Sequence, residues 1–223
     1  MINIKELDGI IFDMDGVIFD SEQIGLRCWV MIGERYGLEN VEQTARRCIG
    51  RSTVDSMQIF EDAYGDRVII PKLYKEGKVL FHEIMEKEGL PLKSGAKQLL
   101  EWLSGNGVKV GLASSTSYNV VVEELKAAGL IDHFSVIVGG DMVEHSKPQP
   151  DIYLLACEKL GVRPEFTAAV EDSRNGMISA HRAGMKPLLV PDLIVPDEEM
   201  LKLAEKKFGS LDELLDELRT ADV

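Results

Sequence analysis

The chain has 223 residues, 45% of them hydrophobic and 28% charged, which is ordinary for a globular protein of one large domain or one domain with an insert. Its formal net charge of −13 argues against nucleic acid or an anionic membrane surface as a main partner. No apolar run approaches the roughly 20 residues of a membrane span, and the first residues do not resemble a signal peptide. The three cysteines are scattered, so we expect reduced thiols and a cytoplasmic location.

A short apolar run near the start of the chain leads into two acidic residues. Gly9-Ile10-Ile11-Phe12 is rich in isoleucine and is followed by Asp13-Met14-Asp15-Gly16, which predicts a buried parallel strand that ends in acids. Both carboxylates aim out of the carboxyl end of the strand, where open α/β sheets bind ligands. Such close carboxylates repel each other, so they require a cation between them or the protonation of one of them. The alternative, a surface turn with two solvated acids, fits a buried strand poorly.

The segment that follows predicts helices and no convincing strand. Apolar residues at helical spacing indicate helices over residues 21–36, 41–48, 53–64 and 73–88, and Gly37 ends the first of them. We therefore predict a helical cap over residues 20–92, inserted into a core made of residues 1–19 and 93–223.

Strands and helices alternate in the rest of the chain. Strands are predicted over residues 108–113, 134–138, 167–170 and 187–190, and helices over 95–103, 118–128, 150–160 and 176–183. Ser94 is the expected cap of the first of these helices, and Ser210 with Glu213 forms a capping box for a C-terminal helix. This alternation predicts an α/β fold with a Rossmann-like parallel sheet and helices on both faces.

Polar residues follow every predicted core strand except the last. Because the carboxyl ends of parallel strands share one edge, groups far apart in the sequence can converge there. Each group alone is a weak signal, but together their order and their repeated position after strands indicate one shared site. The groups are Asp13 and Asp15, then Ser114 and Ser115, then Lys147 in a loop, then Glu171 and Asp172.

The acidic members suit a metal ion and a nucleophile. Asp13 and Asp172, together with Glu171, can hold Mg²⁺, which binds one or two carboxylates plus waters and substrate phosphate. The Asp13 carboxylate can attack phosphorus and form an aspartyl-phosphate. Asp15 can protonate the leaving oxygen and later take a proton from water.

The remaining members suit a phosphate group. Ser114 offers a hydroxyl donor and Lys147 a positive charge, and both match phosphate oxygens. Backbone N–H groups around Asp15 and Gly16 can add further donors.

Four ordered motifs resemble those of the haloacid dehalogenase-like hydrolase superfamily. They are Asp13-Met14-Asp15-Gly16-Val17, Ala113-Ser114, Ser146-Lys147-Pro148 and Glu171-Asp172-Ser173. The Asp20-Ser21-Glu22 step and the helical insert resemble the branch of β-phosphoglucomutases and small-metabolite phosphatases. The resemblance covers essentially the whole chain and implies a parallel-sheet core with a mobile helical cap.

The resemblance also implies a role for each matching residue. Asp13 is the implied nucleophile and a metal ligand, and Asp15 is the implied general acid/base and a metal ligand through its carbonyl. Asp172 is an implied metal ligand. Glu171 beside it is implied either to bind the metal directly or to contact one of the metal's ligands. The implied phosphate-binding residues are Ser114 and Lys147, and we predict that Gly16 and Ser115 bind phosphate with them.

Two departures from the β-phosphoglucomutase pattern concern the cap. Residues 23–26 read Gln-Ile-Gly-Leu, where a histidine is usual, and Thr53 follows Gly50-Arg51-Ser52, where an arginine is usual. A mutase must keep water from its aspartyl-phosphate and hold a second phosphate, so the loss of both groups favours hydrolysis. Arg51 is the cap residue we expect to contact substrate.

These expectations describe a Mg²⁺-dependent phosphatase that hydrolyses a small phosphorylated metabolite, a sugar phosphate or similar phosphomonoester, through an aspartyl-phosphate. The alternatives are a phosphomutase of the β-phosphoglucomutase type and a non-catalytic phosphate-binding module. The expected partner is the metabolite alone, with no nucleic acid or membrane, in a monomer or weak homodimer.

Overall fold

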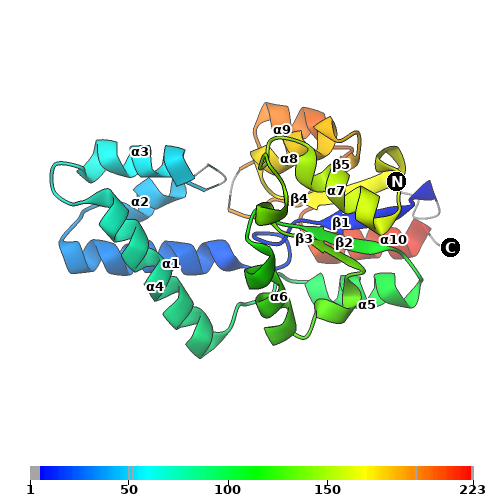
Figure 1. The fold of residues 1–223 in the computed structure, drawn as a ribbon, viewed down its shortest axis with the longest axis horizontal. Coiled ribbons are helices and arrows are strands. Elements are labelled where there is room, and N and C mark those ends of the chain that lie inside the picture. The colour runs from blue at the N-terminus through cyan, green and yellow to red at the C-terminus, as the bar shows by residue number, and fades with distance from the viewer. Residues whose placement is uncertain (1–5, 50, 52, 194, 222–223) are drawn as a thin grey trace. The chain divides into compact units, whose positions relative to one another are not determined.

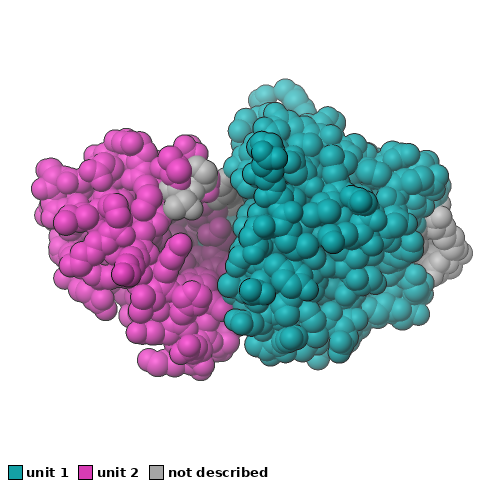
Figure 2. All heavy atoms as spheres, viewed as in Figure 1, with its two compact units in different colours: residues 1–19, 91–223 teal, residues 20–90 magenta. Residues whose placement is uncertain are grey.

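The computed structural model describes residues 6–49, 51, 53–193 and 195–221, and it divides the chain into two compact units (Figure 2). The sheet unit comprises Met1–Phe19 and Pro91–Val223, and the helical unit comprises Asp20–Leu90. The helical unit is thus one continuous insertion into the sheet unit. Within the described residues, no helix combines the length and the apolar character that crossing a membrane requires.

The sheet unit is built on a parallel sheet, which confirms the predicted α/β fold. Its six strands within the described residues are ordered β3-β2-β1-β4-β5-β6. The central strand β1 pairs in parallel with β2 on one side and β4 on the other, and this reversal of strand order is where open α/β sheets form their ligand crevice. The strands are β1 (Gly9–Phe12), β2 (Val110–Ala113), β3 (Val136–Val138), β4 (Thr167–Glu171), β5 (Lys186–Leu189) and β6 (Lys206–Lys207).

Helices cover both faces of this sheet (Figure 1). Helices α7 and α8 contact the strands on one face, where Ile11, Ala113 and Val138 pack with Ile152 and Tyr153 in one buried cluster. Helices α5 and α10 contact each other, and α5 lies below the sheet in Figure 1. The helices are α5 (Ala96–Gly105), α6 (Tyr118–Ala127), α7 (Asp151–Leu160), α8 (Arg174–Arg182), α9 (Glu198–Leu203) and α10 (Leu211–Ala221).

The helical unit contains α1 (Ser21–Tyr36), α2 (Val41–Arg46), α3 (Thr53–Tyr64) and α4 (Ile70–Glu88). Aromatic rings form much of its core, with Trp29 and Phe60 4.2 Å apart between ring centroids and Tyr74 edge-on to both. Gly37 ends α1 at φ 61°, a left-handed conformation that glycine adopts without strain. The all-helical character predicted for this segment is confirmed.

Several helix starts differ from the prediction. Helix α8 begins at Arg174 rather than at residue 176, because the Ser173 side chain caps it by accepting from the N–H of Gly176. Helix α4 begins at Ile70 rather than at residue 73, because Pro71 falls in its first turn, where the missing N–H removes no hydrogen bond. Helix α5 has Gly95 as its N-cap, so the prediction that Ser94 caps this helix is wrong. The Ser94 hydroxyl instead donates to Asp212 Oδ2 at 2.6 Å, a tertiary contact that competes with the local cap.

The C-terminal part holds two elements that the sequence did not predict. Strand β6 has two residues and α9 has six, lengths at which periodicity carries little signal. The predicted cap of α10 is half present. Ser210 Oγ accepts from Glu213 N at 3.2 Å, whereas the Glu213 carboxylate accepts from the backbone N–H of Gly209 rather than that of Ser210.

Candidate active site

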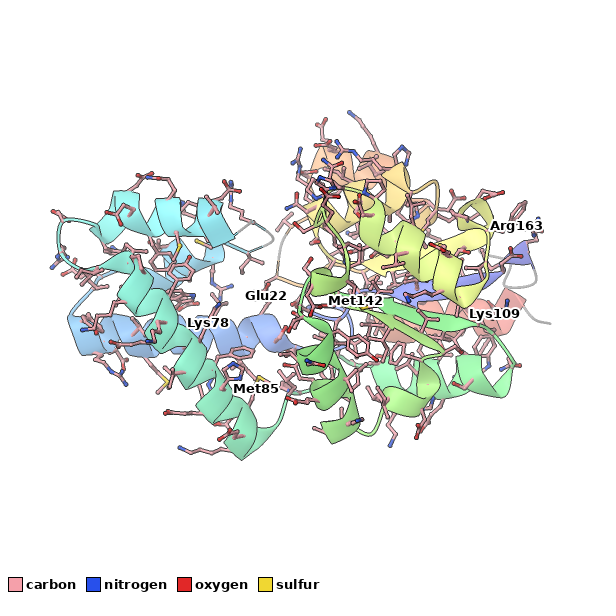
Figure 3. All side chains as sticks on the ribbon, viewed as in Figure 1. Glu22, Lys78, Met85, Lys109, Met142 and Arg163 are labelled. Atoms are coloured by element: carbon pink, nitrogen blue, oxygen red, sulfur yellow. The ribbon has the colours of Figure 1, made fainter. Side chains whose placement is uncertain are left out.

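The candidate site lies at the carboxyl edge of the parallel sheet. Figure 3 shows Met142, which follows β3, at one end of the sheet unit, and Lys109 and Arg163, which precede β2 and β4, at the other. Asp13 directly follows β1, and its N–H still donates to Val170 O at 3.0 Å, so the pairing with β4 fixes its backbone. The backbone of Asp13, the first of the predicted strand-end residues, is therefore held in place by the sheet.

A buried lysine links the ends of three strands. Lys147 Nζ donates to Asp13 Oδ1 at 2.6 Å, to Glu171 Oε1 at 2.7 Å and to the carbonyl oxygen of Ala113 at 3.0 Å. Burial lowers the pKa of this amine, but the two carboxylates more than offset that effect and hold its pKa above the ordinary value. Lys147 is therefore an ammonium at neutral pH, with all three N–H groups engaged by protein oxygens.

Two glycines make room for the acidic residues that end β4. Gly16 has φ 80°, and a Cβ at this position would overlap the carboxylate of Asp172. A Cβ on Gly176, in the first turn of α8, would likewise overlap the carboxylate of Glu171. The chain thus brings Asp172 against the turn after β1, and it seats Glu171 against the start of α8.

The carboxylates form a set that suits a hard divalent cation. Asp13, Glu171 and Asp172 are buried, and one oxygen from each lies within 4.8 Å of the others. Burial raises the pKa of Asp13 above its usual range, and the negative charges of Glu171 and Asp15 add to this against the opposing effect of Lys147. Three acids against one ammonium leave uncompensated negative charge, and an all-oxygen donor set fits Mg²⁺.

Asp15 lies beside this set and has a hydroxyl partner. Its Oδ2 accepts a hydrogen bond from Thr116 Oγ1 at 3.0 Å, and the N–H of Thr116 donates to Ser114 Oγ at 3.0 Å. Ser114 is fully buried, whereas Ser115 is exposed and its carbonyl packs against Gly140. The structure thus connects Asp15 and Ser114 through a threonine that the sequence argument passed over.

The structure brings most of the predicted site residues into contact, and their roles remain predictions. Thr116 and Tyr153 join them although the sequence did not single them out. Thr116 extends a run of hydroxyl residues after β2, which is a weak signal, and Tyr153 reads from sequence as an ordinary core residue of a helix. The residues joined directly or through one neighbour are Asp13, Asp15, Gly16, Ser114, Lys147, Glu171 and Asp172.

The helical unit has a pocket of its own, of about 210 Å³, lined in part by Glu22, Trp29, Tyr74 and Arg51. Arg51 is exposed, and its Nε donates to the carbonyl oxygen of a residue one turn earlier at 2.9 Å. Positions 50 and 52, the glycine and serine of the predicted Gly-x-Ser element, lie outside the described residues. The expected contact of Arg51 with substrate stays a prediction.

Comparisons with known proteins agree on one family. The family described as haloacid dehalogenase-like hydrolase matches residues 10–190. A phosphorylated carbohydrates phosphatase of Thermotoga maritima is 32% identical over 184 residues, covering 81% of this chain and 83% of that protein. Hexitol phosphatase B of Escherichia coli is 34% identical over 128 residues, covering 57% of this chain and 58% of that protein.

A solved structure extends this likeness over nearly the whole chain. A HAD family hydrolase from Deinococcus radiodurans, crystallised with bound phosphate and sodium, superposes with a TM-score of 0.82 at 28% sequence identity. The match covers 97% of both chains. The likeness therefore includes the sheet unit and the helical unit alike.

Proposed function

Since the chain belongs to the haloacid dehalogenase-like hydrolase family, we propose that it is a Mg²⁺-dependent phosphatase of a small phosphorylated metabolite, a sugar phosphate or similar phosphomonoester, with Asp13 as nucleophile. The observation that carries the proposal is the buried ion-pair cluster in which Lys147 holds both Asp13 and Glu171 at the carboxyl edge of the sheet. The names of the relatives, phosphatases of phosphorylated carbohydrates and of hexitols, support the substrate class.

In the first step, an oxygen of the Asp13 carboxylate attacks the phosphorus of the ester. The bond between phosphorus and the ester oxygen breaks, and Asp15 as a carboxylic acid gives its proton to the departing oxygen, which leaves as an alcohol. Lys147 places its positive charge against the phosphate oxygens, which requires one of its N–H groups to leave a protein acceptor.

In the second step, the Asp15 carboxylate takes a proton from water as that water attacks the phosphorus of the aspartyl-phosphate. The bond between phosphorus and the Asp13 oxygen breaks, which releases inorganic phosphate and restores both residues to their starting states. The hydrogen bond from Thr116 Oγ1 orients the Asp15 carboxyl.

The residues that would hold Mg²⁺ are Asp13, Asp172 and the backbone carbonyl of Asp15, with Glu171 beside them. When bound, the cation neutralises negative charge on the carboxylates and on the substrate phosphate. Glu171 already accepts hydrogen bonds on both of its oxygens, from Lys147 and Tyr153 on Oε1 and from Ser173 on Oε2. We therefore place it at the margin of the metal site.

The experiment is phosphate release from a panel of phosphorylated metabolites, with Mg²⁺ and with chelator. We expect release that requires Mg²⁺ and that falls by about four orders of magnitude in Asp13→Asn, because removal of a catalytic nucleophile has effects of this size. Asp8→Asn is the matched control, since Asp8 precedes the same strand and pairs with Arg163 at the opposite edge. Undiminished turnover in Asp13→Asn would exclude the mechanism.

The same protein tests the mutase alternative. With β-glucose 1-phosphate and a bisphosphate primer, a phosphatase yields free phosphate, whereas a mutase yields glucose 6-phosphate. The cap departures noted in the sequence favour free phosphate, and glucose 6-phosphate as the main product would overturn the assignment to hydrolysis.

A further inference from the structure

Tyr153 is a fully buried tyrosine in the first turn of α7, and the mechanism above does not use it. Its ring packs with Ile11, Ala113 and Val138 from the sheet. A tyrosine in such an apolar cluster needs a hydrogen-bond partner for its hydroxyl, and phenylalanine would fill the same space without that need. The hydroxyl therefore calls for an explanation.

The hydroxyl of Tyr153 contacts both members of a buried ion pair. It donates to Glu171 Oε1 at 2.7 Å and lies 3.5 Å from Lys147 Nζ, which is itself 4.9 Å from the centre of the tyrosine ring. Glu171 Oε1 consequently accepts two hydrogen bonds, one from each neighbour. A single aromatic residue thus holds the carboxylate through its hydroxyl and the ammonium through its ring.

The number of N–H groups on Lys147 limits how this amine can bind a phosphate oxygen. An ammonium has three N–H groups, and those of Lys147 go to Asp13, Glu171 and the carbonyl of Ala113. To bind a phosphate oxygen the amine must release one acceptor, and Asp13 is the one whose oxygens the chemistry requires. The short contacts left to the amine are then those with Glu171 and Ala113, beside the longer 3.5 Å contact with the Tyr153 hydroxyl.

These two remaining anchors differ in rigidity. The Ala113 carbonyl belongs to strand β2, so the backbone fixes it, whereas Glu171 holds the amine through a side chain. The Glu171 carboxylate is oriented at Oε2 by the Ser173 hydroxyl at 3.1 Å and at Oε1 by Tyr153. Without the tyrosine hydroxyl, Oε1 would have the mobile amine as its partner and no fixed donor.

We propose that Tyr153 is a positioning residue for phosphate binding: its hydroxyl fixes the Glu171 carboxylate so that Lys147 stays in place when one N–H turns from Asp13 to a phosphate oxygen. This inference rests on the proposed function, because it assumes that Lys147 binds the phosphate of the substrate. Tyr153 touches neither substrate nor metal in this account and acts through two neighbours.

The test is Tyr153→Phe, which keeps the ring and removes the hydroxyl. We expect inorganic phosphate to bind about tenfold more weakly by titration calorimetry in Mg²⁺, the scale of one hydrogen bond to a charged group. KM should rise by about the same factor with kcat changed less than about threefold, because the contact with phosphate exists in both the bound substrate and the transition state. The Mg²⁺ concentration for half-maximal activity should stay within about twofold, because Tyr153 is not a ligand.

A double-mutant cycle separates positioning from a general structural role. In the Lys147→Met background, Tyr153→Phe should change phosphate affinity less than about twofold, since the group it positions is gone. An equal tenfold loss in both backgrounds would overturn the proposal. Tyr64→Phe is the matched control. Its buried hydroxyl donates to Glu39 O at 2.7 Å in the helical unit, so its loss should leave phosphate affinity unchanged.

A second variant covers the case in which Tyr153→Phe does not fold. Glu171→Met removes the acceptor of the Tyr153 hydroxyl, so it should also weaken phosphate binding, and undiminished affinity in it would overturn the proposal. Unchanged phosphate affinity in folded Tyr153→Phe, or a shift in Mg²⁺ dependence alone, defeats the inference and leaves the proposed function intact. Tyr153-dependent phosphate binding without turnover of any ester supports the inference and removes the phosphatase. A wild-type protein that neither binds phosphate nor hydrolyses an ester defeats both.

Discussion

Both units have exposed ion pairs, but among the described residues the sheet unit alone has a buried cluster of them. In the sheet unit, Lys147, Asp13 and Glu171 form ion pairs with side chains 6%, 11% and 0% exposed. In the helical unit, the pair between Arg27 and Glu88 has side chains 54% and 52% exposed. Among the described residues, the buried polar side chains of the helical unit are neutral hydroxyls, such as Thr44 and Ser56.

This difference has an energetic consequence, because buried and exposed ion pairs contribute differently to stability. Burying a charge costs several kcal/mol unless partners compensate it, and a well-packed apolar core is often at least as stable. Exposed ion pairs add little and are screened by salt. The sheet unit therefore has buried charges at one edge, where an apolar cluster of the same size would often be at least as stable, whereas the helical unit follows the usual pattern of buried apolar and exposed charged residues.

The largest expected contrast comes from removing one cation in each unit. Lys147→Met leaves Asp13 and Glu171 buried without their shared ammonium, so we expect unfolding to become easier by about 3–5 kcal/mol in metal-free protein at pH 7. Arg27→Met removes an exposed cation and should leave the denaturant midpoint unchanged. Equal denaturant midpoints for Lys147→Met and wild type would show that Asp13 and Glu171 do not need the ammonium of Lys147 to stay buried.

Metal should act on the sheet unit alone. A cation that binds the folded state at about 100 times its dissociation constant stabilises by about 2.7 kcal/mol, so saturating Mg²⁺ should raise the melting temperature over the chelated protein. Asp172→Asn should remove this rise, because Asp172 belongs to the buried carboxylate set. Asp8→Asn at the opposite edge should retain it in full. A rise of equal size in Asp172→Asn would exclude this metal site.

Glycine substitutions test how closely each unit is packed. A Cβ on Gly176 would overlap the Glu171 carboxylate, so Gly176→Ala should destabilise by about 2 kcal/mol and displace the anchor of Lys147. Gly25, in the interior of α1, has nothing within 4 Å of an added Cβ, so Gly25→Ala should stabilise by about 0.5–1 kcal/mol. Chemical unfolding of both variants measures the contrast, and a neutral Gly176→Ala would contradict the close approach.

The smallest expected effect depends on pH. Burial, and then the charges of Asp15 and Glu123, raise the pKa of Glu124 from 4.5 to about 7. The folded state therefore holds this proton more tightly than the unfolded state, and the contribution of Glu124 to stability falls as pH rises from about 4.5 to about 7. The melting temperature of Glu124→Gln should be a few degrees higher than that of wild type at pH 8. Near pH 4 the two melting temperatures should be equal.

Glu158→Gln provides the control for this pH series, because Glu158 is exposed on α7. Its melting temperature relative to wild type should be the same at both pH values. A gain for Glu124→Gln that did not depend on pH would show that its origin is not the charge.

The strongest sequence signals were those that repeat. The isoleucine run before Asp13 predicted a buried strand, and four strand ends with polar residues predicted one shared edge, which the contacts of Lys147 with Asp13 and Glu171 bear out geometrically. The sequence predicts helix α1 with its observed bounds, because an apolar stripe and a terminal glycine agree. Short elements such as β6 were missed because two residues cannot display a period.

The succession of strands and helices along the chain was thus determined by the sequence itself. Alternating strands and helices, the helical insertion and the set of acids, hydroxyls and lysine at strand ends all follow from short-range patterns, because periodicity and turn residues act over a few neighbours. Tertiary structure alone decided the contacts that no strand-end pattern predicts. The hydroxyl groups of three residues donate hydrogen bonds to distant carboxylates: Ser94 to Asp212, Thr116 to Asp15 and Tyr153 to Glu171. Such contacts join residues far apart in the chain, and their energies depend on burial and geometry that exist after the sheet has assembled.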